Sequence, residues 1–567
     1  MRSLFALLVA LLLAGVLLAQ APARNGRRPQ RKDSPADNTG PDPLPTPQGL
    51  LERSHSIIQD LPVELRASVL ASMATSAARL DAKLGKQYAT ELFNLSQQIT
   101  DPTAHAAAQV GAVRAMTVNN NDLPTAVELF HRMDGIDPEQ LTAGQRDPRL
   151  QAARFLFPAL MGEDFARRFG PRRYDSSEEG AGTGGGEKKQ SEKKPGNSFA
   201  TVIEEAQRLQ PVGMYPYFAV AQAASGLPVD KENNPLESSF ADSEQIFRQS
   251  TRSSTANDEF RDMLRGYWTR VPKDLAQTAL HDLANSIIAV GDQGSATLQT
   301  FGSNGRQTLN LQSSADAALV ELVPIMRQLD PQLLDKLKGD RPDFARAVDQ
   351  VGNGGVMVTG SGSSGRGNGN GQSWNGGGAG PASGSAYNNR ATMAGIRNAA
   401  QQNPQQAMTM ASNITDPTQA SMALAMVAGN LANDDPKAAA DALQKAQDAA
   451  EKISDKSAQL RADISLANSA DRIDNDLALR SALETGFNTG NELLRDEIDA
   501  QPDQEPSWTQ LATLTSIGMR RLPELTISLI EEVSVPSVEA RLLLNAANSI
   551  QQSRRERAQT TAEVKKE

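Results

Sequence analysis

The sequence contains no cysteine and little histidine or aromatic character. Its 567 residues include no Cys, 4 His and 3 Trp, and aromatic residues make up 4% of the chain. The absence of cysteine excludes disulfide bonds, thiolate metal sites and cysteine nucleophiles. The shortage of aromatic rings argues against a protein that holds sugars or bases by stacking. A net charge of −10 disfavours polyanions, so we expect no nucleic-acid partner.

Sequence motifs for catalysis are also missing. The four histidines fall in separate helical contexts and lack a second ligand at helical spacing; they are His55, His105, His131 and His281. The acidic stretch at 471–476 lacks the glycine and the closing glutamate of a calcium loop. We therefore expect no catalytic residue, no cofactor and no metal ion. Catalysis by a pair of carboxylates alone stays open.

The first residues have the pattern of a secretory signal peptide. Arg2 precedes an apolar run that ends at Ala19, and Ala19-Gln20-Ala21 offers a small-x-small cleavage site. The run is short of the roughly 20 residues that span a bilayer. Basic residues follow it, which opposes export, because positive charge tends to stay cytoplasmic. We expect export to the periplasm or outside the cell, with membrane contact only if the signal is not cleaved.

The pentapeptide ITDPT occurs twice, at 99–103 and 414–418. In both copies the Asp can accept hydrogen bonds from the free N–H groups of a helix start. The following Pro suits the first helical position, where its missing N–H costs nothing. Each copy therefore predicts the start of a helix.

Small or apolar residues follow the two copies at the same helical spacing. They are Ala108, Ala112, Val113 and Met116 after the first copy, and Ala423, Val427, Ala428 and Leu431 after the second. This spacing predicts one buried stripe of a helix. The pattern recurs after Ile453, Ile498 and Val533, and again around Leu283. A second helix is predicted between successive copies, at 121–133, 434–453 and 521–533.

Two helices and their turns fill the interval of about 35–45 residues between copies. Here the sequence resembles the antiparallel helix-pair repeats, tetratricopeptide-like and HEAT-like. It departs from the tetratricopeptide consensus, because its period is longer and the consensus Trp, Leu-Gly and Tyr positions are not recognisable. The resemblance implies an all-α fold, an α-solenoid in which neighbouring pairs stack to bury their stripes, and a role in binding other proteins.

Segments rich in Pro, Gly or charge divide the chain. The expected order is a signal peptide at 1–21, a tether at 22–48, helical repeats at 49–174, a linker at 175–198, a central helical block at 199–351, a Gly-rich linker at 352–389, helical repeats at 390–552 and a charged tail at 553–567. The central block contains Asn304-Gly305 between two runs rich in Thr and Leu. Residues 296–312 are therefore either a β-hairpin or a surface loop.

Two patches are candidate partner-binding surfaces. The first is basic and consists of Arg167, Arg168, Arg172 and Arg173. These residues can bind an acidic partner through guanidinium contacts, or can simply end a helix. The second is aromatic and consists of Tyr215, Tyr217, Phe218, Tyr267 and Trp268. These rings can form an interface hot spot or the core of the central block.

Taken together, these features predict a non-catalytic, exported scaffold that mediates protein–protein interactions in the bacterial cell envelope. Two alternatives remain: an envelope enzyme that acts on polysaccharide from an α/α toroid, and a periplasmic holdase-type chaperone.

Overall fold

The fold is described here from a computed structural model of the chain. The described residues are 45–118, 122–135, 147–162, 165, 198–210, 214–229, 234–291, 294–302, 305–351, 355–359, 395–396, 398–400, 403–432, 434–501 and 506–564. They all belong to one compact unit, Pro45–Glu567. The expected signal peptide, most of the tether and most of both linkers lie outside the described residues.

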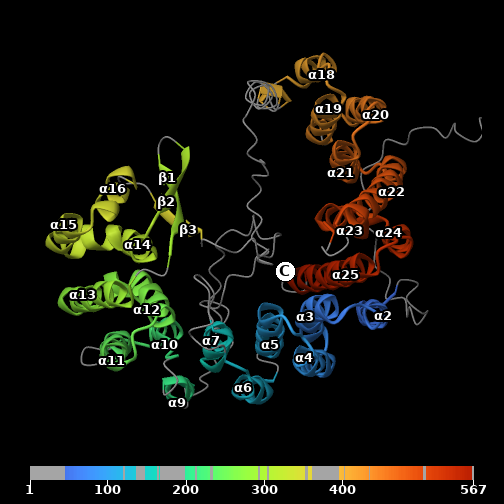
Figure 1. The fold of residues 1–567 in the computed structure, drawn as a ribbon. Helices are drawn as coiled ribbons and strands as arrows, with labels where there is room; N and C mark the ends of the chain where they lie inside the picture. Colours follow the sequence, from blue (N-terminus) through green and yellow to red (C-terminus); the bar gives the residue numbers. More distant parts are fainter. Residues whose placement is uncertain are drawn as a thin grey trace, which may run out of the picture. The chain divides into compact units, whose positions relative to one another are not determined.

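Helices form the N-terminal and C-terminal blocks (Figure 1). The N-terminal block contains α2 (Pro47–Ile58), α3 (Val63–Leu80), α4 (Ala82–Ser96), α5 (Pro102–Thr117), α6 (Leu123–His131) and α7 (Pro148–Leu160). The C-terminal block contains α18 (Pro404–Ser412), α19 (Pro417–Leu431), α20 (Pro436–Ala450), α21 (Lys456–Arg472), α22 (Asp476–Ala500), α23 (Thr509–Arg521), α24 (Pro523–Glu531) and α25 (Pro536–Val564). The helix α25 continues through most of the segment expected as a charged tail.

The central block combines helices with a small sheet. Its helices are α9 (Ser198–Leu209), α10 (Tyr217–Ala224), α11 (Pro235–Gln249), α12 (Ser254–Tyr267), α13 (Lys273–Val290), α14 (Ser314–Leu329), α15 (Pro331–Asp340) and α16 (Pro342–Val351). Its strands are β1 (Ala296–Gly302), β2 (Gly305–Leu311) and β3 (Gly355–Thr359).

The hairpin interpretation of residues 296–312 is confirmed. Strands β1 and β2 pair antiparallel, from Ala296 opposite Leu311 to Gly302 opposite Gly305. The expected Gly-rich linker needs a correction at its start, because Gly355–Thr359 forms β3 and pairs with the other side of β1. Glycine dominates that linker as a whole, but the run Val356-Met357-Val358 has the β-branched character of a strand. Helices α14 and α16 pack against this sheet (Figure 1).

Both copies of ITDPT begin a helix as predicted. Asp101 accepts a hydrogen bond from the N–H of Ala104 at 2.6 Å and caps α5. Asp416 accepts one from the N–H of Gln419 at 2.8 Å and caps α19. A proline occupies the first turn of each helix, so sequence chemistry sets these two boundaries locally.

The predicted stripes are buried. Every stripe residue of α5 and α19 is at most 4% exposed. Helices approach closely where the chain supplies small residues: a Cβ added to Gly85 of α4 would lie 2.5 Å from the Cα of Ala78 in α3. A larger residue there would force the two helices apart.

Helix pairs stack on one another, so the chain is an α-solenoid. Pairs are formed by α3 with α4, α5 with α6, α19 with α20, and α21 with α22. One helix from each repeat contacts the next in an order that is not the order of the chain. This packing order is α19, α21, α23, α25, α3, α5, α7, α10 and α12. The C-terminal block therefore packs ahead of the N-terminal block.

The two ends of the described chain together complete one repeat. Helix α25 packs against α2 much as α19 packs against α20, and it also contacts α3 (Figure 1). The Ser54 hydroxyl of α2 donates to the carbonyl of Ala540 in α25 at 2.9 Å, in a buried position. Arg541 of α25 donates to the Ser68 hydroxyl of α3, also at 2.9 Å. We call this contact between α25 and helices α2 and α3 the terminal seam.

None of the helices in the described part of the chain is both long enough and apolar enough to cross a bilayer.

Candidate protein-binding groove

The aromatic candidates fall in two environments. Tyr217 and Tyr267 are 1% and 8% exposed. The Tyr217 ring meets Phe260 edge-on at 5.3 Å between centroids, and Phe260 stacks on Phe247 at 4.0 Å. Tyr217 and Tyr267 therefore belong to the core of the central block. Their burial favours the core alternative over the interface alternative, because a buried ring offers little surface to a partner.

The remaining aromatic candidates are closer to the surface. Phe218 and Trp268 are partly buried and pack on the core. The guanidinium of Arg154 lies over the Phe218 ring at 4.7 Å from its centroid. Tyr215 is 4% exposed but lines a surface groove. The basic candidates Arg167, Arg168, Arg172 and Arg173 lie outside the described residues.

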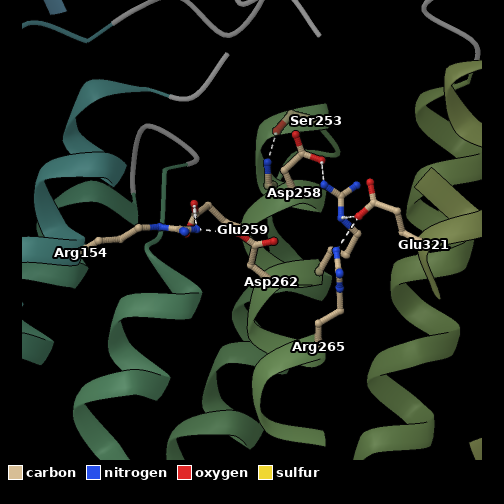
Figure 2. Close-up of polar contacts among 9 residues, drawn as sticks. Arg154, Ser253, Asp258, Glu259, Asp262, Arg265 and Glu321 are labelled. Atoms are coloured by element: carbon tan, nitrogen blue, oxygen red, sulfur yellow. Dashed lines mark hydrogen bonds and ion pairs between the residues drawn. The ribbon is translucent and has the colours of Figure 1, made fainter. Parts of the chain in front are cut away.

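Ion pairs join α7, α12 and α14 (Figure 2). Arg154 of α7 lies 2.6 Å from a carboxylate oxygen of Glu259 and 2.8 Å from one of Asp262, both on α12. Arg265 of α12 lies 2.8 Å from the carboxylate of Glu321 on α14. Burial raises the pKa of Glu321, and the nearby cations oppose that rise. The pairs of Arg154 connect the N-terminal block to the central block, and the pair of Arg265 joins two helices of the central block.

Each histidine contacts one carboxylate from a different element. The Nε2–oxygen distances are 2.8 Å for His55 and Glu91, 3.1 Å for His105 and Asp134, 2.6 Å for His131 and Glu205, and 2.6 Å for His281 and Asp330. Hydrogen bonds from Gln277, the Leu333 N–H and His281 lower the pKa of Asp330 to about 2. Within the described ranges, no cluster of three or more His, Asp or Glu side chains could hold a metal ion. These pairs link neighbouring helices.

Two carboxyl groups have pKa values raised to about 7. Burial raises the pKa of Asp463 in α21 to about 7, against one hydrogen bond from Gln459. Burial and the neighbouring Asp282 raise the pKa of Glu244 in α11 to about 7, against the charge of Arg248. The two groups lie in different blocks, so they do not form a pair of catalytic carboxylates.

A groove of about 530 Å³ opens between α9 and α11. Its volume is within the usual range for ligand sites in proteins. The lining residues are Phe199, Ile203, Gln207, Tyr215, Leu227, Pro235, Ser238, Ser239, Asp242, Gln245, Ile246 and Gln249.

The two helices give this groove unlike walls. Phe199 and Ile203 stand one turn apart on α9 and give an apolar wall. Ser238, Asp242 and Gln245 lie on one face of α11 and give a polar wall. Asp242 supplies the only charge among the lining residues. The sequence analysis missed this site, although the apolar spacing on α9 and the polar spacing on α11 are both visible in the sequence.

Comparisons with known proteins do not assign the chain to a family. No family of known proteins matches the chain, and no curated protein matches it. Solved structures similar to it include a circular tandem repeat protein with novel repeat topology and enhanced subunit contact surfaces, at 11% identity and a TM-score of 0.14, covering 90% of this chain and 99% of that one. Another is the APC/C hetero-tetramer Cut9-Hcn1, at 10% identity and a TM-score of 0.15, covering 84% of this chain and 89% of that one. Such TM-scores support no inference, so the helix-repeat class rests on the helix packing described above.

Proposed function

We propose that this chain is an exported, non-catalytic scaffold that binds other proteins in the bacterial cell envelope. The observation that carries the proposal is the packing order of the helix pairs, which continues through the terminal seam from the C-terminal block into the N-terminal block. Stacked repeats of this kind present long rows of side chains suited to extended protein partners. Export rests on the signal-peptide pattern of residues 1–21.

The charged groups of the described residues also fit a scaffold. The buried carboxylates of α12 and α14 lie against arginines, and each histidine lies against a carboxylate of another element. Groups that neutralise one another across helices are poorly placed to act on a substrate. The groove between α9 and α11 provides a concave surface with both apolar and polar walls.

Crosslinking in living cells tests this proposal. The full-length tagged chain is crosslinked and purified, and bound proteins are identified by mass spectrometry. A variant without residues 1–21 is the control for location. A short, reproducible set of envelope proteins that is lost in the control is the expected result. A set that is unchanged without the signal would refute export, and no bound protein in either sample would refute the scaffold.

A further inference from the structure

The groove between α9 and α11 contains, among the described residues, a carboxylate without an ion pair and a buried hydroxyl without a hydrogen-bond partner. Among the described residues, the carboxylate of Asp242 makes no ion pair. Burial raises the pKa of the Tyr215 phenol in the same lining, and the nearby charges, including that of Asp242, add to the rise. The Oγ of Ser239 is buried and has no hydrogen-bond partner, in a residue that is 5% exposed. A buried hydroxyl without a partner costs free energy that a ligand group can recover.

The neighbouring arginines are already engaged. Arg208 of α9 pairs with Glu204 at 3.2 Å, and Arg248 of α11 lies 2.7 Å from Asp282 of α13. Neither arginine lines the groove. The carboxylate of Asp242 can therefore pair with a cation that comes from outside the described lining. Coulomb attraction favours a positively charged ligand over a negatively charged one.

The rest of the lining indicates what surrounds that cation. Phe199, Ile203 and Ile246 are each partly exposed at the groove, and Val229, two residues beyond Leu227 of the lining, is 65% exposed. These surfaces favour an apolar side chain. The amides of three lining glutamines, at 207, 245 and 249, can both donate and accept, as the backbone of a bound peptide requires.

We propose that this groove binds a segment of a partner protein in which an aliphatic or aromatic side chain lies next to a Lys or Arg. The apolar side chain packs on Phe199 and Ile203, and the cation pairs with Asp242. The proposal rests on the scaffold function, for which it names a binding site and the chemistry of the partner segment. We expect this charge-assisted hydrogen bond to contribute at least tenfold in affinity, which corresponds to about 1.4 kcal/mol.

Selection from a library of random dodecapeptides displayed on phage tests the site. The purified full chain is used as bait, and selected peptides are synthesised and titrated by fluorescence anisotropy. We expect the selected sequences to carry Lys or Arg beside Leu, Ile or Phe. Asp242→Asn should weaken their binding at least tenfold. Asp441→Asn is the matched control, because Asp441 is an exposed helical Asp on α20, in another block.

A double-mutant cycle separates direct pairing from a structural effect. Replacing the peptide cation with Gln should cost as much affinity as Asp242→Asn, and the two changes together should cost no more than either one. Ile203→Arg should abolish binding while the urea midpoint of the chain stays unchanged. Selected peptides without a preference for cations would overturn the proposal, as would equal binding by Asp242→Asn and Asp441→Asn.

If the groove is occupied by something other than a partner protein, the experiments give different results. A wild-type dimer that Ile203→Arg dissociates would assign the groove to a second copy of the chain. Tighter peptide binding after deletion of residues 186–196 would assign it to the chain's own Lys-rich sequence. Either result would overturn the proposal that the groove binds an external partner. Peptides that bind without sensitivity to Asp242→Asn would refute this site and leave the scaffold function standing, which the crosslinking experiment tests separately.

Discussion

The terminal seam makes a specific prediction about Leu51→Ala. Leu51 of α2 is 0% exposed, and α2 packs on α25 from the other end of the chain. The substitution removes about three carbon groups at roughly 0.8 kcal/mol each and leaves a cavity, so we expect a loss of about 2–5 kcal/mol. Leu477→Ala is the matched control, because Leu477 of α22 is 82% exposed. We expect the control to change stability by at most about 0.5 kcal/mol.

A split chain measures the seam directly. A protease site is inserted within residues 360–394, and the folded chain is cut there. The two parts should remain together on size exclusion, because α25 packs on α2 and α3. Leu51→Ala should raise the dissociation constant of the two parts by about thirtyfold or more, since each 1.4 kcal/mol is a factor of ten.

Two results would refute this reasoning. Wild-type parts that separate at micromolar concentration would show that the seam does not hold the ends together. An equal effect of Leu51→Ala and Leu477→Ala would show that burial of Leu51 does not contribute to the association. In either case, the packing order that places the C-terminal block ahead of the N-terminal block would lose its support.

Two further predictions concern buried charge. Because burial raises the pKa of Asp463 from 3.8 to about 7, the folded state holds its proton more tightly than the unfolded state. The free energy of unfolding should therefore fall as pH rises from about 4 to 7, and Glu244, whose pKa is also raised to about 7, adds to this fall. Urea titrations at pH 5 and 8 should show a smaller fall for Asp463→Asn than for the unchanged chain. Arg154→Met takes a cation away from the buried carboxylate of Glu259 and should cost about 3 kcal/mol in urea unfolding. Adding Glu259→Gln should restore part of that loss; no restoration would contradict the pairing.

Local chemistry made part of this fold predictable. The Asp-Pro starts at Asp101 and Asp416 set their helix boundaries through bonds to their own first turns. The buried stripes followed from spacing along single helices, and the hairpin followed from a turn signal between two short runs. Each of these features depends on residues close in sequence, so their patterns can be read without knowing the rest of the fold.

Contacts between distant residues were not predictable in the same way. The bond from Ser54 to Ala540 joins residues 486 positions apart, and no local pattern marks either one. Strand β3 forms because β1 offers it an edge, in a segment whose glycine content indicated a linker. The aromatic patch is another case, since composition cannot tell a core ring such as Tyr217 from an interface ring. Asp242 became a candidate only when the groove placed it against α9.

The terminal seam also explains the place of the Gly-rich sequence in the chain. In the packing order, α25 and α3 are internal neighbours. At one end of the order α18 packs on α19, and at the other end α12 continues through α13 and α14 to α16 and the sheet. Along the chain, the sequence from 360 to 394 therefore connects the last helices of the packing order to the first ones. A connection of that kind is constrained in length: it must reach from one end to the other, at no more than about 3.3–3.6 Å per residue.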